Sequence, residues 1–214
     1  GYISPSGVKD YMDCSLRFYY KYISNIRETN EFTSEIKKID FGNITHDVLK
    51  ILYKDVIKQK NNGLIDLNDF FVIKNSISGA IKKKIRSHFK LNKKNNISLE
   101  GNNIILFKIM EDYISRIVSL DEKYAPFEIF SLEGGRESGF LKKINISNNF
   151  SVNISGKIDR IDFKNNVYRI IDYKTGGDSK KIKGFENLFS GVKKDRNDAI
   201  FQLFFYSLLL RNKL

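Results

Sequence analysis

Apolar residues in the first 124 positions recur every three or four residues, which is the period of amphipathic helices. The first predicted helix begins after Ser4, an expected N-cap, has Pro5 in its first turn and runs to about Ile23. The stripes that predict this helix and three further helices are Val8, Tyr11, Phe18 and Tyr22; Ile44, Val48, Leu49, Leu52 and Val56; Phe70, Ile73, Ile77 and Ile81; and Ile105, Ile109, Tyr113 and Ile117.

From Phe127 the pattern changes to the alternation that is typical of strands. Asn165-Asn166 lies between two apolar, β-branched runs, which predicts a two-residue hairpin turn. Counting outward from this turn pairs Phe163 with Tyr168, Ile161 with Ile170, Asp162 with Arg169, and Asp159 with Asp172.

The apolar positions of the strand before this turn change parity. They are even at Phe150, Val152, Ile154 and Ile158, and odd at Ile161 and Phe163. A bulge at Asp159-Arg160 accounts for the change, and bulges occur often beside active sites.

The predicted register brings two carboxylates, Asp159 and Asp172, to one face of the hairpin. Lys174 belongs to the same face, because it lies two residues beyond Asp172. Like charges directly opposite each other destabilise a sheet, and one of the two carboxylates should protonate unless a cation lies between them. A divalent metal such as Mg²⁺ satisfies this need with carboxylates, waters and substrate phosphates as ligands.

The last predicted helix begins near Asn197-Asp198 and is apolar nearly all round to Leu210, so we expect it to be buried. Gln202 and Tyr206 are its polar members and share one face because they are four residues apart. A buried glutamine needs hydrogen-bond partners, which a phosphate or an active-site carboxylate would supply.

Lysine and arginine outnumber the acidic residues 37 to 25, giving a net charge of +12. This balance indicates a polyanionic partner such as nucleic acid or an anionic membrane surface; an AT-rich genome, which favours lysine codons, is the alternative explanation. One cysteine and two histidines exclude a disulfide framework and an all-protein zinc cluster. They fit a reducing cytoplasm, and no apolar run is long enough to span a membrane.

Several residues admit two interpretations. Arg17, Tyr19, Tyr20 and Lys21 either contact nucleic acid through phosphates and bases or combine packing with solvated charge. The basic stretch Lys82–Lys90, with Lys93 and Lys94, is either a DNA-facing edge or a solvated loop. His46 and His88 are expected to be ordinary structural or surface residues, unless the helix of His46 packs against the hairpin. Glu133 either approaches the metal face or, as we expect, is an exposed acid at the end of a strand. The lysine-rich segment from Lys180 to Arg196 is expected to be a mobile loop.

Taken together, the motifs resemble the PD-(D/E)XK nuclease superfamily, and within it the RecB/AddB-like nuclease domains of helicase–nuclease complexes. They occur in the expected order, from an opening Ser-Pro-Ser with Cys14, Phe18, Tyr19 and Tyr20 through Gly-x-x-x-His46 and Gly-x-x-Asp159 to Asp172-Tyr-Lys174 and Gln202-x-x-x-Tyr206.

The resemblance implies an α/β fold with a restriction-endonuclease-like core, a small mixed sheet flanked by helices. It also implies that Mg²⁺ or Mn²⁺ is held by His46, Asp159, Asp172 and the backbone carbonyl of Tyr173. Lys174 would orient the attacking water. Gln202 and Tyr206 would support the site, and Arg17 and Tyr20 are further candidates for contact with DNA.

Two features depart from some relatives. An iron–sulfur cluster in some AddB-type proteins uses four cysteines, and only Cys14 matches its first position. A cluster is therefore unsupported, and we expect Cys14 to fill a gap in the core. The sequence also has no Gly-x-x-x-x-Gly-Lys-Ser/Thr loop, so a helicase motor would belong to another segment or to a partner.

We therefore expect one nuclease domain over residues 1–214, a fragment of a longer protein. Its helical N-terminal part and insertion would extend over about 1–124, and the catalytic sheet and last helix over about 125–214. The expected function is that of a cytoplasmic, nucleoid-associated, metal-dependent DNA exonuclease in recombinational repair, acting on single- or double-stranded ends. A catalytically silent DNA-binding module and a stand-alone RecB-like nuclease of a CRISPR or phage system are the alternatives.

Overall fold

A computed structural model describes residues 1–26, 38–60, 62–88, 102–134, 140–176 and 184–211. The chain divides into two compact units, each of which is described by itself. The first comprises Gly1–Glu31, Glu133–Arg160 and Ile170–Leu214, and the second comprises Phe32–Leu132 and Ile161–Arg169. The strands lie in a four-stranded sheet of order β1-β2-β5-β6 and a two-stranded sheet of β3 and β4. This mixed α/β architecture is the restriction-endonuclease-like class expected from the sequence.

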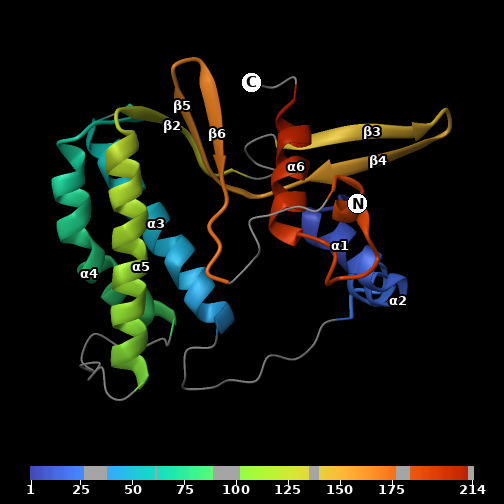
Figure 1. The fold of residues 1–214 in the computed structure, drawn as a ribbon, viewed down its shortest axis with the longest axis horizontal. Coiled ribbons are helices and arrows are strands. Elements are labelled where there is room, and N and C mark those ends of the chain that lie inside the picture. The colour runs from blue at the N-terminus through green and yellow to red at the C-terminus, as the bar shows by residue number, and fades with distance from the viewer. Residues whose placement is uncertain (27–37, 61, 89–101, 135–139, 177–183, 212–214) are drawn as a thin grey trace. The chain divides into compact units, whose positions relative to one another are not determined.

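Three long helices form most of the second unit (Figure 1): α3 (Lys38–Lys60), α4 (Asp69–His88) and α5 (Asn102–Tyr124). The predicted apolar stripes of α3 and α4 are buried. The stripe expected for α5 is wrong, because Ile105 and Ile109 are 59% and 51% exposed. Among the described side chains of α5, the buried apolar ones are instead Phe107, Met110, Ile114 and Val118. This helix carries two apolar stripes, and packing against its neighbours buries only one of them.

The remaining elements of the second unit are short or shared with the first. β1 (Leu64–Ile65) pairs antiparallel with β2 (Phe127–Gly134). Lys82–His88, expected at a loop or a DNA-facing edge, is the last part of α4. Residues 89–101, which include Lys90, Lys93 and Lys94, lie outside the described residues.

The N-terminal helix of the first unit begins as predicted but ends early. Ser4 Oγ accepts a hydrogen bond from the Gly7 N–H at 3.2 Å, and Pro5 is the first residue of α1 (Pro5–Asp13). The chain is extended at Cys14, then continues as α2 (Ser15–Phe18) and a π-helix, η1 (Tyr19–Ile23). The expectation that Cys14 fills the core is wrong, because this residue at the helix break is exposed.

A two-stranded hairpin and a C-terminal helix complete the first unit. β3 (Leu141–Ser147) pairs antiparallel with β4 (Phe150–Ser155), and Figure 1 shows the hairpin extending from beside α6 (Asp198–Leu210). Asn197 caps α6 through the Ile200 N–H at 3.0 Å. Only one side of α6 is buried, including Phe201, Phe205 and Leu209, whereas three apolar side chains on it are at least 37% exposed: Leu203, Phe204 and Leu208.

A buried arginine joins the two ends of this unit. Arg196 donates to Asp13 Oδ1 and Asp198 Oδ1, each at 2.6 Å, and to the Ser190 carbonyl at 2.9 Å. Its side chain has no exposed surface, so the sequence-based placement of Arg196 in a mobile loop is wrong. The last residue of α1 and the first residue of α6 are thereby tied to one guanidinium. Residues 180, 181 and 183 lie outside the described part of the chain.

Candidate active site

The hairpin of β5 (Ile158–Lys164) and β6 (Val167–Ile171) has the turn that the sequence predicts. Asn165 and Asn166 have φ values of 51° and 61°, as the two central residues of a type I′ turn require. Two of the expected side-chain pairs are present, because the rings of Phe163 and Tyr168 have centroids 4.7 Å apart and Arg169 donates to Asp162 Oδ2 at 2.6 and 3.1 Å. Both contacts agree with the register that pairs Asp159 with Asp172.

The chain changes sheets shortly before the parity change, and the predicted bulge at Asp159-Arg160 stays a prediction. β4 ends at Ser155 and belongs to the two-stranded sheet, whereas β5 begins at Ile158 in the four-stranded sheet. The intervening Gly156 and Lys157 are in neither strand. Ile158 and Ile161 both follow this crossover in β5 and both are buried, so β5 has buried apolar residues at both parities.

Asp159 lies beside the end of β6. Its Oδ2 accepts a hydrogen bond from the backbone N–H of Tyr173 at 2.8 Å. Because Tyr173 directly follows Asp172, this bond brings the first carboxylate of the predicted pair to the backbone that carries the second.

Asp172, Lys174 and Gln202 form a connected polar network. The ammonium of Lys174 is ion-paired with Asp172 Oδ2 and donates to Gln202 Oε1 at 3.0 Å. Gln202 Nε2 donates to Asp172 Oδ1 at 3.1 Å. The Asp172 side chain is 5% exposed and that of Lys174 is 35% exposed, so the carboxylate is held inside while the ammonium reaches solvent. The glutamine fixes the position of both charged groups.

Tyr206 continues this network from the next turn of α6. Its hydroxyl accepts from Gln202 Nε2 at 2.5 Å and donates to the Lys157 carbonyl at 2.7 Å. Burial raises the pKa of the Tyr206 hydroxyl, and the nearby charges of Asp172 and Asp159 raise it further. Tyr206 therefore stays protonated at neutral pH and can keep donating to the carbonyl. The predicted common face of Gln202 and Tyr206 is confirmed by their hydrogen bond.

Gly156 and Glu133, which were not among the expected catalytic or metal-binding residues, lie close to this network. A Cβ at Gly156 would lie 2.8 Å from both Leu209 Cδ1 and Tyr206 Cε1, so only glycine lets α6 approach this closely. Glu133, expected to be exposed, has an 11% exposed side chain and pairs with Lys157 at 3.2 Å. Its φ of 50° is uncommon for a residue other than glycine. The spacing Gly-x-x-Asp159 was the available signal for Gly156.

The other predicted site residues are placed as follows. His46 is half-buried on α3 in the second unit, and its role as a ligand stays a prediction, as does that of the Tyr173 carbonyl. Arg17 and Tyr20 lie on α2 and η1 in the first unit, and both are exposed.

The aspartates fit a hard divalent cation chemically. Mg²⁺ binds through one or two carboxylates and keeps its other positions for water and substrate phosphates. Asp159 and Asp172 supply such carboxylates, each with capacity beyond the hydrogen bonds described above. Among the described residues, no group of three or more His, Cys, Asp or Glu side chains is arranged to hold a metal ion. The candidate donor set is therefore the aspartate pair.

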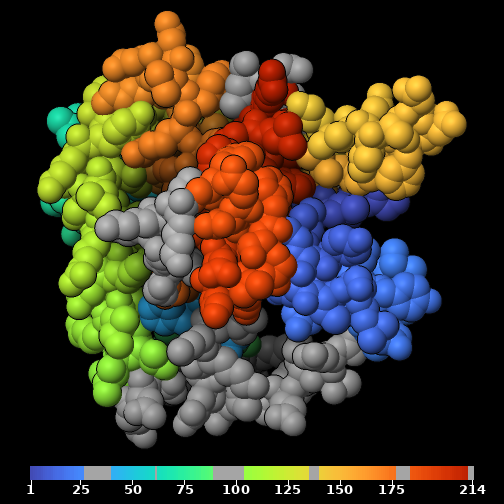
Figure 2. All heavy atoms as spheres, turned by 45° about the vertical axis from the view of Figure 1, so that its right-hand side comes forward, coloured from blue at the N-terminus to red at the C-terminus, as the bar shows by residue number. Residues whose placement is uncertain are grey.

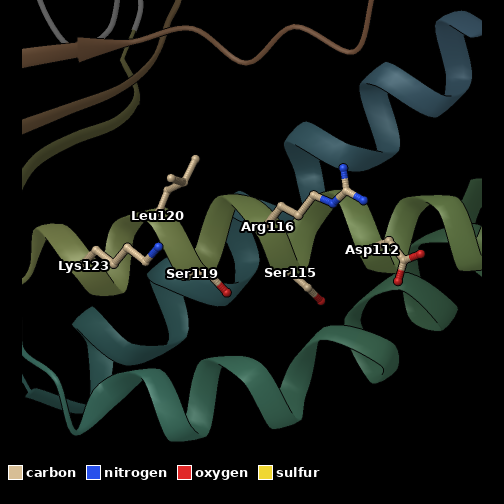
Figure 3. A pocket seen from close by; sticks show the side chains of 6 residues that line it. All are labelled: Asp112, Ser115, Arg116, Ser119, Leu120 and Lys123. Atoms are coloured by element: carbon tan, nitrogen blue, oxygen red, sulfur yellow. The ribbon is translucent and has the colours of Figure 1, made fainter.

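A pocket on the second unit does not compete for this role. It has a volume of about 650 Å³ and is lined along α5 by Asp112, Ser115, Arg116, Ser119, Leu120 and Lys123. Figure 3 shows Arg116 and Leu120 pointing to one side of the helix and the two serines to the other. With a single carboxylate and no convergent network, this surface lacks the groups that metal-dependent hydrolysis needs.

The chain belongs to the PD-(D/E)XK nuclease superfamily, whose family model matches residues 2–214. It is also similar to a protein of Carboxydothermus hydrogenoformans that is named as a subunit of an ATP-dependent helicase/deoxyribonuclease, with 29% identity over 186 residues. That alignment covers 81% of this chain and 16% of the relative, so the chain spans only a small part of that protein's length. Membership of the superfamily supports a nuclease.

Within the described residues, no helix is both long and apolar enough to cross a membrane.

Proposed function

We propose that this chain is a metal-dependent deoxyribonuclease that hydrolyses phosphodiester bonds, acting as the exonuclease domain of an AddB/RecB-like helicase–nuclease in recombinational DNA repair. The observation that carries the proposal is the network that links Gln202 of α6 to four residues at the open end of the β5–β6 hairpin: Asp159, Asp172, Tyr173 and Lys174. The name of the similar protein supports the assignment to a helicase–nuclease.

Asp159 and Asp172 would hold Mg²⁺ or Mn²⁺, with His46 and the Tyr173 carbonyl as further candidate ligands. When bound, the ion would lower the pKa of a water molecule and neutralise charge on the scissile phosphate. The chain's own groups prepare this chemistry. Lys174, which contacts Asp172 and Gln202, would donate a hydrogen bond to the attacking water or to a phosphate oxygen.

Gln202 also holds the catalytic groups in place before the substrate binds. Gln202 Nε2 donates to both Asp172 and Tyr206 while its Oε1 accepts from Lys174, so its amide has one orientation that satisfies all three partners. Groups held in this way need no reorganisation when the phosphate becomes charged. The net charge of +12 would add an attraction for DNA that does not depend on base sequence.

The test compares cleavage by the wild-type chain and Asp172→Ala on linear single- and double-stranded DNA, in Mg²⁺ or Mn²⁺ and in EDTA. We expect cleavage by the wild type only with metal, and none by the variant. The variant should still retard DNA on a gel, because the basic surface and not the acid pair carries the affinity. A wild-type chain that binds DNA but leaves it intact with either metal would instead establish a silent binding module.

A further inference from the structure

The first unit carries an exposed tyrosine-rich surface that the catalytic network does not use. We define it as Tyr11, Leu16, Arg17, Tyr19, Tyr20 and Lys21, from α1, α2 and η1, all of which are exposed. Tyr11, Tyr19 and Tyr20 are 59%, 51% and 46% exposed. Scattered surface aromatics are common, but three exposed tyrosines within ten residues of one segment make it a candidate interaction site.

The local fold keeps these rings outside. Neither α2 nor η1 contributes a buried residue, so the segment is ordered without the core burial that normally offsets the loss of chain entropy. It is held by surface contacts instead. Asp10 accepts from Lys21 at 2.7 Å and from Tyr22 at 3.0 Å, and Phe18 stacks on Tyr22 with centroids 5.1 Å apart. The predicted apolar stripe of this helix therefore packs on itself at the surface.

The π-helical turn presents two tyrosines side by side. The Ser24 N–H donates to the Tyr19 carbonyl, five residues earlier, at 2.9 Å, which is the hydrogen bond that defines a π-helix. Short π-helical turns are often found at functional sites. The rings of Tyr19 and Tyr20 have centroids 5.7 Å apart and are inclined at 70°. The contact is edge-to-face and not stacked, so at most one ring face is taken up by the neighbouring ring.

The surface is rigidly connected to the helix of the candidate active site. Asp13 at the end of α1 and Asp198 at the start of α6 share the buried Arg196, and Lys9 pairs with Asp198 at 3.2 Å. A ligand bound to the tyrosine-rich surface would thus be held at a fixed position relative to α6. Figure 2 shows the N-terminal segment, in blue, as part of the molecular surface.

We propose that this tyrosine-rich surface binds single-stranded DNA by stacking its bases on Tyr19 and Tyr20, an inference that rests on the proposed function and names its substrate as a single strand. Stacking on aromatic side chains is how proteins bind unpaired bases without sequence preference. The chain's charge of +12 favours a polyanion over an apolar partner. Bases in a duplex are already stacked and cannot use these rings.

The contribution of the surface is stacking more than charge. Lys21 is paired with Asp10, and Arg17 lies 3.7 Å from Asp13. Both cations are therefore partly compensated, and the remaining basic side chains of the chain supply most of the salt-dependent affinity. Replacing the tyrosines should consequently weaken binding by a factor that changes little with salt.

The test measures fluorescence anisotropy of a labelled oligothymidylate in EDTA, beside an oligonucleotide of equal length whose central positions lack bases. We compare the wild type with Tyr19→Ala/Tyr20→Ala, with the ring-retaining Tyr19→Phe/Tyr20→Phe, and with Phe185→Ala. Phe185 is a matched control, since it is a 54% exposed aromatic residue of the same unit.

The double alanine variant should bind oligothymidylate at least about thirtyfold more weakly at both low and high salt, with little change for the abasic oligonucleotide. The phenylalanine and Phe185 variants should bind as the wild type does. Because the chain has no tryptophan, stacking should also quench tyrosine emission, and only with the base-containing strand.

Unchanged binding of oligothymidylate by the alanine variant, or an equal loss for both oligonucleotides, would overturn the proposal and leave the surface to a protein partner. EDTA separates this outcome from failure of the proposed function. Tyrosine-dependent binding by a chain that never cleaves refutes only the nuclease activity, whereas cleavage with tyrosine-independent binding refutes only the stacking surface.

Discussion

Replacing Gln202 with leucine tests whether the amide positions the catalytic groups. Leucine has a similar volume and favours helices, so α6 should persist. The change removes hydrogen bonds to two charged groups, Asp172 at 3.1 Å and Lys174 at 3.0 Å, and the bond to the Tyr206 hydroxyl at 2.5 Å. Bonds to charged groups contribute about 1.5–3 kcal/mol each.

The expected loss is smaller than the sum of the two bonds. Lys174 and Asp172 keep their ion pair, and the 35% exposed Lys174 can replace part of its lost bond with water. We expect a loss of about 2 kcal/mol of transition-state stabilisation, which corresponds to about a 30-fold decrease in kcat. The assay is steady-state cleavage of single-stranded DNA in Mg²⁺, with melting temperature recorded for each variant.

Gln59→Leu is the matched control, since Gln59 is an exposed glutamine on α3, and it should leave kcat unchanged. A kcat for Gln202→Leu within threefold of the wild type would refute the positioning role. A fall in kcat that follows a loss of folded protein would refute it as well, because the effect would then be on stability alone.

The remaining predictions concern stability. Gly156→Ala should destabilise the fold by about 1–3 kcal/mol in urea unfolding, because the added methyl group overlaps side chains of α6; unchanged stability would contradict the close packing. Arg169→Ala should cost about 3 kcal/mol by leaving two buried aspartates without their guanidinium, whereas Arg116→Ala on the open face of α5 should cost less than about 0.5 kcal/mol. Burial alone would raise the pKa of Asp198, but hydrogen bonds and nearby cations lower it below 3.8. The contribution of ionised Asp198 to the free energy of unfolding is therefore complete above the unfolded-state pKa of 3.8, and it is lost as the pH falls through the lower pKa of the folded state. The stability difference between wild type and Asp198→Asn should shrink on acidification, and a constant difference from pH 6 to pH 2.5 would contradict the linkage.

The hairpin was predictable because its signals are local. Asn165-Asn166 specifies the turn through the φ values that it tolerates, and a fixed turn then sets the side-chain pairs by counting. The contact of Asp162 with Arg169 follows from this register. The pairing of helix positions in Gln202-x-x-x-Tyr206 is local in the same way.

The incorrect expectations depended on tertiary contacts. The sequence of α5 contains two apolar stripes, and nothing local decides that Met110 and not Ile109 is buried. Arg196 reads as one basic residue in a lysine-rich loop, and only the fold brings Asp13 to it from far along the chain. The exposed position of Cys14 likewise follows from a helix break that its neighbours do not predict.

The central claim is that Asp159 and Asp172 hold a divalent cation. Its most direct test is calorimetric titration of the 214-residue chain with MnCl₂ in the absence of DNA, for the wild type and for Asp159→Asn and Asp172→Asn. We predict binding by the wild type and at least a tenfold weaker affinity in each variant, at unchanged melting temperature. Equal affinity for Mn²⁺ in all three folded proteins would contradict the account.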